Sequence, residues 1–292
     1  MTATATTWAE VLHATEQRLA RAGVPEPAVD AAWLVSAVSG WSRTLLHLHR
    51  AERPARAVLD RLAPLVDRRA RREPLAYVLG SQEFMGLSFA VDARVLVPRW
   101  DSEVLVERCV ALVADQPAPL LADLGTGSGA LAIALAHALP RARVWASDQC
   151  ADALALARAN AERLGVSARV TFLRGDLGGP LLAAGLAERC AAVVANLPYI
   201  PRAVLADLEP EVRDHEPRAA LDGGPDGLDV VRAAAPNLAA LLAPGGWTLV
   251  EHGDDQGPAV RALLAATPGL AVAEQVLDYG GRERAVLARR IA

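Results

Sequence analysis

The sequence predicts an α/β protein in which a mostly parallel, seven-stranded, Rossmann-like sheet follows a small all-α domain. Two observations support this prediction. Before residue 75, apolar residues recur every three to four positions, as at Trp8, Val11 and Leu12, which is typical of amphipathic helices. After Asp101, short apolar runs alternate with longer Ala- and Leu-rich segments, which is typical of the strand–helix units of a parallel sheet.

These patterns divide the chain into three parts. Residues 1–75 are expected to form a helical domain, residues 76–100 a β-hairpin linker around Gly86, and residues 101–292 the α/β domain. The last segments of the chain are expected to close the sheet with an antiparallel edge strand. The other strands are expected in the runs LLADLG, RVWASD, RVTFLRGD, AAVVANLP, GWTLVEHG and RAVLARR.

Composition and charge exclude several classes of protein. The chain has 292 residues, 52% of them hydrophobic, and a formal net charge of −4, so a packed core is expected but direct nucleic-acid binding is not. No uncharged apolar run reaches the roughly 18 residues of a membrane span. The first segment carries Glu10 and Glu16 and lacks a signal-peptide core. We therefore expect a cytoplasmic protein with no membrane partner.

Residue types that are missing from the sequence, or scattered along it, exclude further kinds of active site and metal site. The sequence contains no lysine, which excludes a Walker-type phosphate loop and a Schiff-base lysine. Cys109, Cys150 and Cys190 form no close pair, so we expect three buried, reduced thiols and no metal site. The Arg-rich stretch 50–73 contains Glu52, Asp60 and Asp67, and it is expected to be a solvated helix face with ion pairs.

A glycine-rich turn after the first expected strand of the α/β domain is the candidate cofactor site. Glycines in LGTGSG allow a tight turn and the close approach of a nucleotide-like ligand. The next two strands end in Asp148 and Asp176, placed for ribose and adenine recognition, although each carboxylate is also suited to cap the following helix. The candidate cofactor-binding residues are Asp123, Gly125, Thr126, Gly127, Ser128, Gly129, Asp148, Asp176, Leu177 and Asn196.

The fourth strand of this domain ends in the candidate chemical site, Asn196-Leu197-Pro198-Tyr199. The side-chain oxygen of Asn196 and a backbone carbonyl can accept the two N–H bonds of a planar NH2 group, and Tyr199 can pack against that group. Holding both hydrogens discourages conjugation of the nitrogen lone pair and aims it at a methyl donor, so catalysis would depend on positioning. The alternative for this tetrapeptide alone is an ordinary turn. The expected catalytic residues are Asn196, Pro198 and Tyr199, and Leu197 is expected to join them in binding the substrate.

Taken together, these segments resemble the bacterial glutamine methyltransferases of release factors, the HemK/PrmC family. The resemblance covers nearly the full length and includes the helical amino-terminal part. It rests on the segments GSQEFMGLSFAVDARVLVPRWDSE, DLGTGSG, Asn-x-Pro-Tyr-Ile-Pro, EVRDHEPRAALDGGPDGLD, LVEHG and DYGGRER.

The resemblance implies methylation of the glutamine amide in the Gly-Gly-Gln loop of peptide chain release factors, with S-adenosyl-L-methionine as cofactor. It also implies that the amino-terminal helices hold the protein substrate. Two residues depart from the family pattern: Leu197 stands where the family has proline, and Trp100 stands where its linker has Pro-Arg-Pro. Pro198 still favours an extended Leu197.

Three other functions remain open at this stage. Asn-Leu-Pro-Tyr is also similar to the motif of adenine dimethyltransferases of ribosomal RNA, so methylation of an exocyclic amino group in nucleic acid is one alternative, and another protein or small-molecule acceptor is a further one. A non-catalytic cofactor-binding module is the alternative from a different class. It has no need of Asn196, Pro198 and Tyr199, and cofactor binding without turnover would support it.

Overall fold

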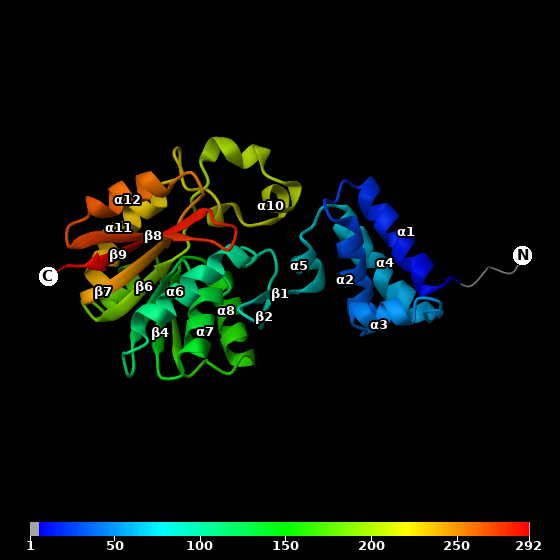
Figure 1. Cartoon of the computed structure of the whole chain (residues 1–292), viewed down its shortest axis with the longest axis horizontal. Coiled ribbons are helices and arrows are strands. Elements are labelled where there is room, and N and C mark those ends of the chain that lie inside the picture. Colours follow the sequence, from blue (N-terminus) through cyan, green and yellow to red (C-terminus); the bar gives the residue numbers. More distant parts are fainter. Residues whose placement is uncertain (1–5, 292) are drawn as a thin grey trace, which may run out of the picture. The chain divides into compact units, whose positions relative to one another are not determined.

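The structure is a computed structural model that describes residues 6–291 (Figure 1). Residues 1–5 and 292, at the ends of the first and third predicted parts, lie outside the described residues. The chain divides into two compact units. The first unit comprises residues 1–80 and 209–215, and the second comprises residues 81–208 and 216–292.

The first unit is helical, as the spacing of its apolar residues predicted. Thr7 and Glu10 form a reciprocal capping box at the start of its first helix, which buries Trp8, Val11 and Leu19. Gly40 ends the second helix in the left-handed conformation, with φ 72°. The helices are α1 (Trp8–Arg21), α2 (Pro27–Ser39), α3 (Arg43–Leu48), α4 (Arg56–Ala70), α5 (Leu75–Leu79) and, from the distant segment, α10 (Pro210–His215).

Two features of the first unit differ from the sequence-based division. Its boundary lies at Gly80 rather than at residue 75, because the short helix α5 continues the helical packing past the expected end. It also includes Glu209–His215, which lies inside the part assigned to the α/β domain. The Arg-rich stretch explains this addition, since Arg69 and Arg72 form ion pairs with Glu211 at 2.7 and 2.6 Å. Part of that stretch is therefore buried rather than solvated, with Arg69 only 5% exposed.

The second unit begins with the expected hairpin, β1 (Ser81–Phe84) and β2 (Leu87–Ala90), which pair antiparallel. Met85 and Gly86 join them with φ of 51° and 70°, so both turn residues lie in the left-handed region that two-residue hairpins use. The 3-10 turn η1 (Trp100–Ser102) then leads into α6 (Glu103–Val113).

A seven-stranded sheet forms the centre of the second unit, in the order β5-β4-β3-β6-β7-β9-β8. The first five strands in this order pair parallel, whereas β9 pairs antiparallel with both β7 and β8. The predicted fold class is thereby confirmed, including the antiparallel edge. The strands are β3 (Leu120–Leu124), β4 (Arg143–Asp148), β5 (Val170–Arg174), β6 (Cys190–Ala195), β7 (Leu242–Glu251), β8 (Leu270–Leu277) and β9 (Glu283–Arg290).

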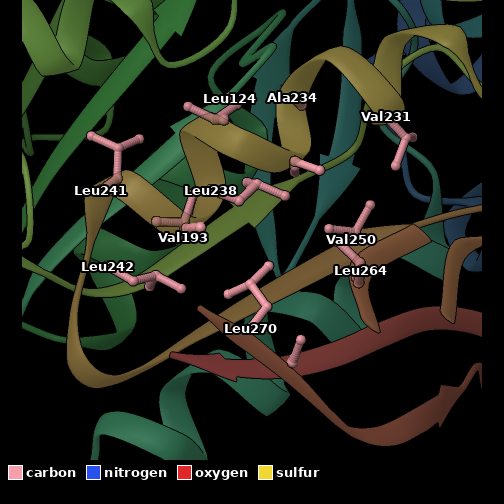
Figure 2. Close-up of a cluster of buried hydrophobic side chains, with 14 of the residues drawn as sticks. Leu124, Val193, Val231, Ala234, Leu238, Leu241, Leu242, Val250, Leu264 and Leu270 are labelled. Atoms are coloured by element: carbon pink, nitrogen blue, oxygen red, sulfur yellow. The ribbon is translucent and has the colours of Figure 1, made fainter. Parts of the chain in front are cut away.

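Helices pack against the sheet and bury its aliphatic side chains. Helix α6 contacts α7 (Ala130–Ala138), which contacts α8 (Ala151–Arg163); α9 (Gly179–Ala183) contacts α11 (Asp229–Leu241), which contacts α12 (Gly257–Ala265). Figure 2 shows part of this core, where Leu238 of α11 lies near Val193 of β6. The turns η2 (Arg202–Asp207) and η3 (Arg218–Ala220) complete the unit. Among residues 6–291, no helix is both long and apolar enough to cross a membrane.

Candidate active site

The sheet brings the glycine loop and the Asn196 turn together. Strands β3 and β6 are neighbours, with Leu124 at the end of β3 paired to Ala195 at the end of β6. The next residues, Gly125 and Asn196, therefore leave the sheet side by side, at the point where the strand order reverses and α/β sheets bind ligands. A Cβ on Gly125 would lie 3.0 Å from Cδ2 of Leu197, so these two loops touch.

The loop requires glycine for two reasons: its backbone has positive φ angles, and one position leaves no room for a Cβ atom. Gly125, Gly127 and Gly129 have φ of 71°, 54° and 83°, which other residues rarely adopt. A Cβ on Gly129 would also lie 2.8 Å from Cδ1 of Ile133, at the start of α7. The loop is held to β4, because the amides of Gly125 and Thr126 donate to the carbonyl of Ser147 at 2.9 and 3.0 Å.

Asp123 heads this loop from a buried position. Its Oδ2 accepts hydrogen bonds from the Thr126 hydroxyl at 2.6 Å and from the Ala132 amide at 3.2 Å. Its Oδ1 is also buried but has no partner among the described residues. Burial raises the pKa of Asp123 to about 7. One carboxylate oxygen thus remains free to accept from a ligand.

Asp148, at the end of β4, contacts both the glycine loop and the start of the next helix. Its Oδ2 accepts from the Gly127 amide at 2.9 Å, and its Oδ1 accepts from the Cys150 amide at 2.8 Å, at the start of α8. Each carboxylate oxygen can accept a second hydrogen bond, so capacity remains for ribose hydroxyls. Cys150 itself is exposed. The expectation of three buried thiols is therefore wrong for this residue, because it caps an exposed helix end.

Asp176 and Leu177 follow β5 and differ in their surroundings. The carbonyl of Leu177 accepts a hydrogen bond from the Ser147 hydroxyl at 2.6 Å, which ties this loop to the strand that carries Asp148. Leu177 is partly buried, with φ 46°, whereas Asp176 is exposed. The apolar side chain of Leu177 is therefore the better placed of the two to line an adenine ring.

The Asn196 amide contacts a residue that the sequence did not single out. Its Nδ2 donates to the hydroxyl of Ser102 at 3.0 Å. The buried carboxylate of Glu251, at the end of β7, accepts from the Tyr199 hydroxyl. Burial raises the pKa of Glu251 to about 7. Both Ser102 and Glu251 lie in segments that carried the family resemblance, PRWDSE and LVEHG, but neither residue type alone indicated a role.

The turn that follows Asn196 is held by close backbone packing. The carbonyl of Tyr199 accepts from Nε2 of Gln256 at 2.8 Å, and its hydroxyl donates to Glu251 at 3.4 Å. A Cβ on Gly227 would lie only 2.3 Å from the Tyr199 carbonyl oxygen, so the segment GGPDGLD needs glycine where it crosses this turn. Burial raises the pKa of the Tyr199 hydroxyl well above its usual value, and the hydroxyl therefore stays protonated at neutral pH.

Asn160 is a second residue without an assigned role in the sequence. It is fully buried in α8, where its Nδ2 donates to the carbonyl of Ser128 at 3.0 Å. The same side chain exchanges two hydrogen bonds with the backbone of Ala90 in β2. A single amide therefore fixes the hairpin against the glycine loop.

No group of three His, Cys, Asp or Glu side chains within residues 6–291 is arranged to hold a metal ion.

Comparison with known proteins shows the family. Residues 10–80 match the model of the PrmC N-terminal domain, and residues 121–215 match a methyltransferase domain model. The release factor glutamine methyltransferase of Moorella thermoacetica is 48% identical over 94% of this chain and 95% of its own length. That of Geobacter sulfurreducens is 44% identical over 95% and 94%. Among solved structures, TrmN from Thermus thermophilus is 26% identical over 64% of this chain and 48% of its own, with a TM-score of 0.45.

The two curated relatives cover both units, and the family models match the helical and methyltransferase parts separately. The prediction of a methyltransferase from the glycine loop and the Asn196 turn is confirmed, and so is the predicted family: the chain belongs to the release factor glutamine methyltransferases.

Proposed function

We propose that this chain methylates the side-chain amide nitrogen of the glutamine in the Gly-Gly-Gln loop of peptide chain release factors, with S-adenosyl-L-methionine as donor. One observation carries the proposal: the pairing of Leu124 with Ala195 sets the glycine loop beside Asn196. A donor on the loop and an amide acceptor on the turn would then share one crevice. The names of the curated relatives support the choice of substrate.

The residues around the glycine loop fit this donor. When bound, S-adenosylmethionine supplies a methyl group on a positively charged sulfur. The unpartnered Oδ1 of Asp123 is suited to accept from its ammonium group, and Asp148 to accept from its ribose hydroxyls. Thr126 and Ser128 shape the loop, Leu177 would line the adenine, and Asp176 would face solvent at its edge.

The Asn196 turn would bind the acceptor amide. Oδ1 of Asn196 and the backbone carbonyl of Leu197 can only accept, so together they can hold both hydrogens of the glutamine NH2 group. This geometry opposes conjugation of the nitrogen lone pair with its own carbonyl and leaves the lone pair available for methylation. Pro198 fixes the turn, and Tyr199 would pack against the planar amide. Rate acceleration would come from positioning rather than from a strong base.

Methyl incorporation into a purified release factor is the direct test of this function. Mass spectrometry should find a gain of one methyl group on the loop glutamine, and replacing that glutamine should abolish the gain. Incorporation into whole RNA instead, with steep salt dependence, would favour an exocyclic amino group of nucleic acid. Absence of both products at micromolar enzyme, despite cofactor binding, would reject the proposal.

The role of Asp148 gives a prediction about the cofactor. Asp148→Ala is expected to weaken S-adenosylmethionine binding by roughly 1–3 kcal/mol, because a charge-assisted hydrogen bond is lost and the Gly127 amide loses its acceptor. Isothermal titration calorimetry measures the change. Asp115→Ala removes an exposed carboxylate that precedes β3, whereas the glycine loop follows this strand, and it should bind the cofactor as the wild type does. Equal affinities of the two variants would contradict the assignment.

The helical unit is proposed to dock the release factor. Its helices α2 and α3 leave four apolar side chains at least 40% exposed, namely Val29, Trp33, Leu45 and Leu48. The guanidinium of Arg43 lies 4.9 Å from the centre of the Trp33 ring, which adds a positive charge to this surface. We call these five residues the α2–α3 surface. An apolar, basic-edged surface of this kind is typical of protein recognition. With a substrate from the translation machinery, the enzyme would act in the cytoplasm.

Removing apolar area from the α2–α3 surface should affect only large substrates. The double variant Trp33→Ala, Leu48→Ser is expected to raise KM for a whole release factor about 10-fold, since losing about 1.4 kcal/mol of binding energy has that effect. Methylation of a short Gly-Gly-Gln peptide should be unchanged. Leu277→Ser in β8 is the matched control, because this leucine is 52% exposed in the other unit. A parallel loss with the peptide would show that docking is not the cause.

A further inference from the structure

A pocket of about 360 Å³ opens on the second unit beside the Asn196 turn. Three segments form its walls: the β1–β2 hairpin, η1 with the start of α6, and the turn between β8 and β9. Trp100 and Glu103 lie on either side of Ser102 in the sequence, and the Ser102 hydroxyl accepts from the Asn196 amide at 3.0 Å. The pocket is therefore close to the place proposed for the substrate amide. The residues that line it are Glu83, Gly86, Trp100, Glu103 and Tyr279.

One guanidinium joins the two segments that carry the aromatic residues of this pocket. Arg284 of β9 pairs with Asp101 at 3.3 Å and with Asp278 at 3.1 Å. Asp101 follows Trp100 in the sequence. Asp278 precedes Tyr279, so the bridge through Arg284 holds η1 against the turn between β8 and β9.

Two further contacts hold α6 to the other walls. The amide of Met85, in the hairpin turn, donates to Oε1 of Glu103 at 2.6 Å. Arg108 of α6 pairs with Glu274 of β8. All three walls are thus linked by charged or hydrogen-bonded groups, and the pocket is formed without a ligand.

The two aromatic rings of the pocket are open to solvent. Trp100 is 67% exposed and Tyr279 is 62% exposed. Large exposed rings that lie together are typical of recognition sites. The face of an aromatic ring carries partial negative charge and attracts cations, and tryptophan does so most strongly. The rings therefore favour a positively charged ligand.

Two carboxylates in the pocket favour the same charge. Within the described part of the chain, neither Glu83 nor Glu103 forms an ion pair, and Glu103 accepts only from a backbone amide. The lining includes no arginine that would neutralise them. A guanidinium is flat, so it can stack on an aromatic ring while its N–H groups donate to carboxylates.

We propose that this pocket binds an arginine side chain of the protein substrate, at a position near the methylated glutamine in the substrate sequence. The inference rests on the proposed function, and it names a substrate feature that the same site would recognise. The guanidinium would stack on the exposed rings and donate to the two carboxylates. An arginine held there would anchor the substrate chain beside the acceptor amide and help to hold the glutamine against Asn196.

Other occupants fit the pocket less well. A nucleic-acid base can stack on the rings, but the carboxylates would repel the phosphates next to it. An apolar side chain would bury the carboxylates without supplying a partner for them. Pockets for small ligands span roughly 300–1,000 Å³, so this one, at the lower end, suits a single long side chain.

The pocket also gives a role to a residue that the proposed chemistry does not use. Trp100 stands where the linker of the family has proline. A proline has no aromatic face for a cation. We therefore expect the recognition of arginine to depend on Trp100.

Peptides that differ only in charge test the proposal. Each contains Gly-Gly-Gln and a single arginine, placed in turn at each flanking position. In the matched peptide, citrulline replaces arginine, which keeps the shape and removes the charge. At one or more positions, the arginine peptide should have a KM about 10-fold lower, the effect of one cation–π contact with a charge-assisted hydrogen bond. The kcat should change little. Equal KM values at every position would overturn the proposal.

Variants of the pocket should remove this difference. Trp100→Leu keeps an apolar side chain without an aromatic face, whereas Trp100→Phe keeps a ring. The double variant Glu83→Gln, Glu103→Gln removes both charges but keeps an oxygen for the Met85 amide. The citrulline-to-arginine ratio of KM should fall from about 10 toward 1 in Trp100→Leu and in the double variant, and Trp100→Phe should retain part of it. A ratio near 10 in Trp100→Leu or in the double variant would reject this pocket as the site.

A control variant removes a carboxylate elsewhere in the same unit. Glu162 is exposed in α8, outside the lining of the pocket. Glu162→Gln should leave the KM ratio unchanged. Because Trp100 and Glu83 are exposed as well, Tm of the pocket variants should change little. An equal loss of the ratio in Glu162→Gln would show that the general charge of the unit, not the pocket, attracts arginine.

Direct binding separates failure of this inference from failure of the proposed function. N-acetyl-arginine amide, titrated into the full chain, should shift the indole N–H signal of Trp100 in NMR spectra, and its citrulline analogue should not. Trp100→Phe identifies the signal by its absence. The shift in a protein that methylates no Gly-Gly-Gln peptide would reject only the proposed function. Methylation with equal KM for both peptides, and no shift, would reject only this inference.

Discussion

Asn196→Ala is expected to lower kcat about 1000-fold, at the upper end of what removal of one preorganised hydrogen-bonding group costs an enzyme. The side-chain oxygen that would hold one hydrogen of the acceptor amide is removed, while the glycine loop stays intact. Affinity for S-adenosylmethionine should therefore remain within a few-fold of the wild type. Single-turnover methylation of a release factor and calorimetry of cofactor binding measure the two effects separately.

Two further variants sharpen this prediction. Asn196→Asp keeps the shape but replaces the Nδ2 donor to Ser102 with an oxygen and adds a negative charge beside the acceptor amide, so it should also be severely impaired. Asn237→Ala is the matched control, because the side chain of that asparagine, in α11, accepts a hydrogen bond from the Gly178 amide at 3.1 Å and is not part of the turn. If Asn196→Ala lost cofactor affinity and kept kcat, the division of roles between loop and turn would be wrong.

Arg69→Met is expected to have the largest effect on stability, lowering the free energy of unfolding of the helical unit by about 3–5 kcal/mol. Arg69 lies between two acids, with Nε 2.6 Å from Asp30 and Nη1 2.7 Å from Glu211. All three side chains are largely buried, at 6%, 11% and 15% exposure. Methionine fills similar space but leaves two carboxylates without this cation, and an uncompensated buried charge is costly.

An exposed ion pair on the same helix supplies the control. Arg56 and Asp60 of α4 pair at 2.9 Å, with side chains 86% and 57% exposed. Arg56→Met should therefore change stability by less than about 1 kcal/mol. Urea unfolding measures both variants, and amide hydrogen exchange in α1 to α4 shows whether the loss lies in the first unit. Similar effects of the two variants would mean that burial of Arg69 does not determine its contribution.

Much of the fold and part of the site could be predicted because their signals are local. Alternating apolar runs and helical segments predicted the parallel sheet, and the loop LGTGSG lies at the end of β3 as expected. Parallel strands end at the same edge of a sheet, so placing Asp148, Leu177 and Asn196 at strand ends was enough to bring them near one another. What each of these residues binds remains a prediction from chemistry.

The remaining features depend on contacts that no local pattern encodes. Ser102 meets Asn196, and Glu251 meets Tyr199, only because β6 and β7 are neighbours and η1 lies beside their ends. Serine and glutamate are common on surfaces, and nothing in the sequence marks these two as buried. The same applies to Glu211. Its position in the sequence assigns it to the α/β part, but it forms an ion pair with Arg69 and belongs to the helical unit.

Because Glu209–His215 belongs to the helical unit, exchanging that unit between two members of the family requires more than one segment of the chain. The chain enters that unit twice, so a single cut after Gly80 does not free it. A fragment starting at Ser81 would carry Glu209 and Glu211 without Arg69 and Arg72, their partners. A chimaera that takes its helices from another member of the family would need the matching short graft after η2 as well, because the two pieces have to be complementary in charge.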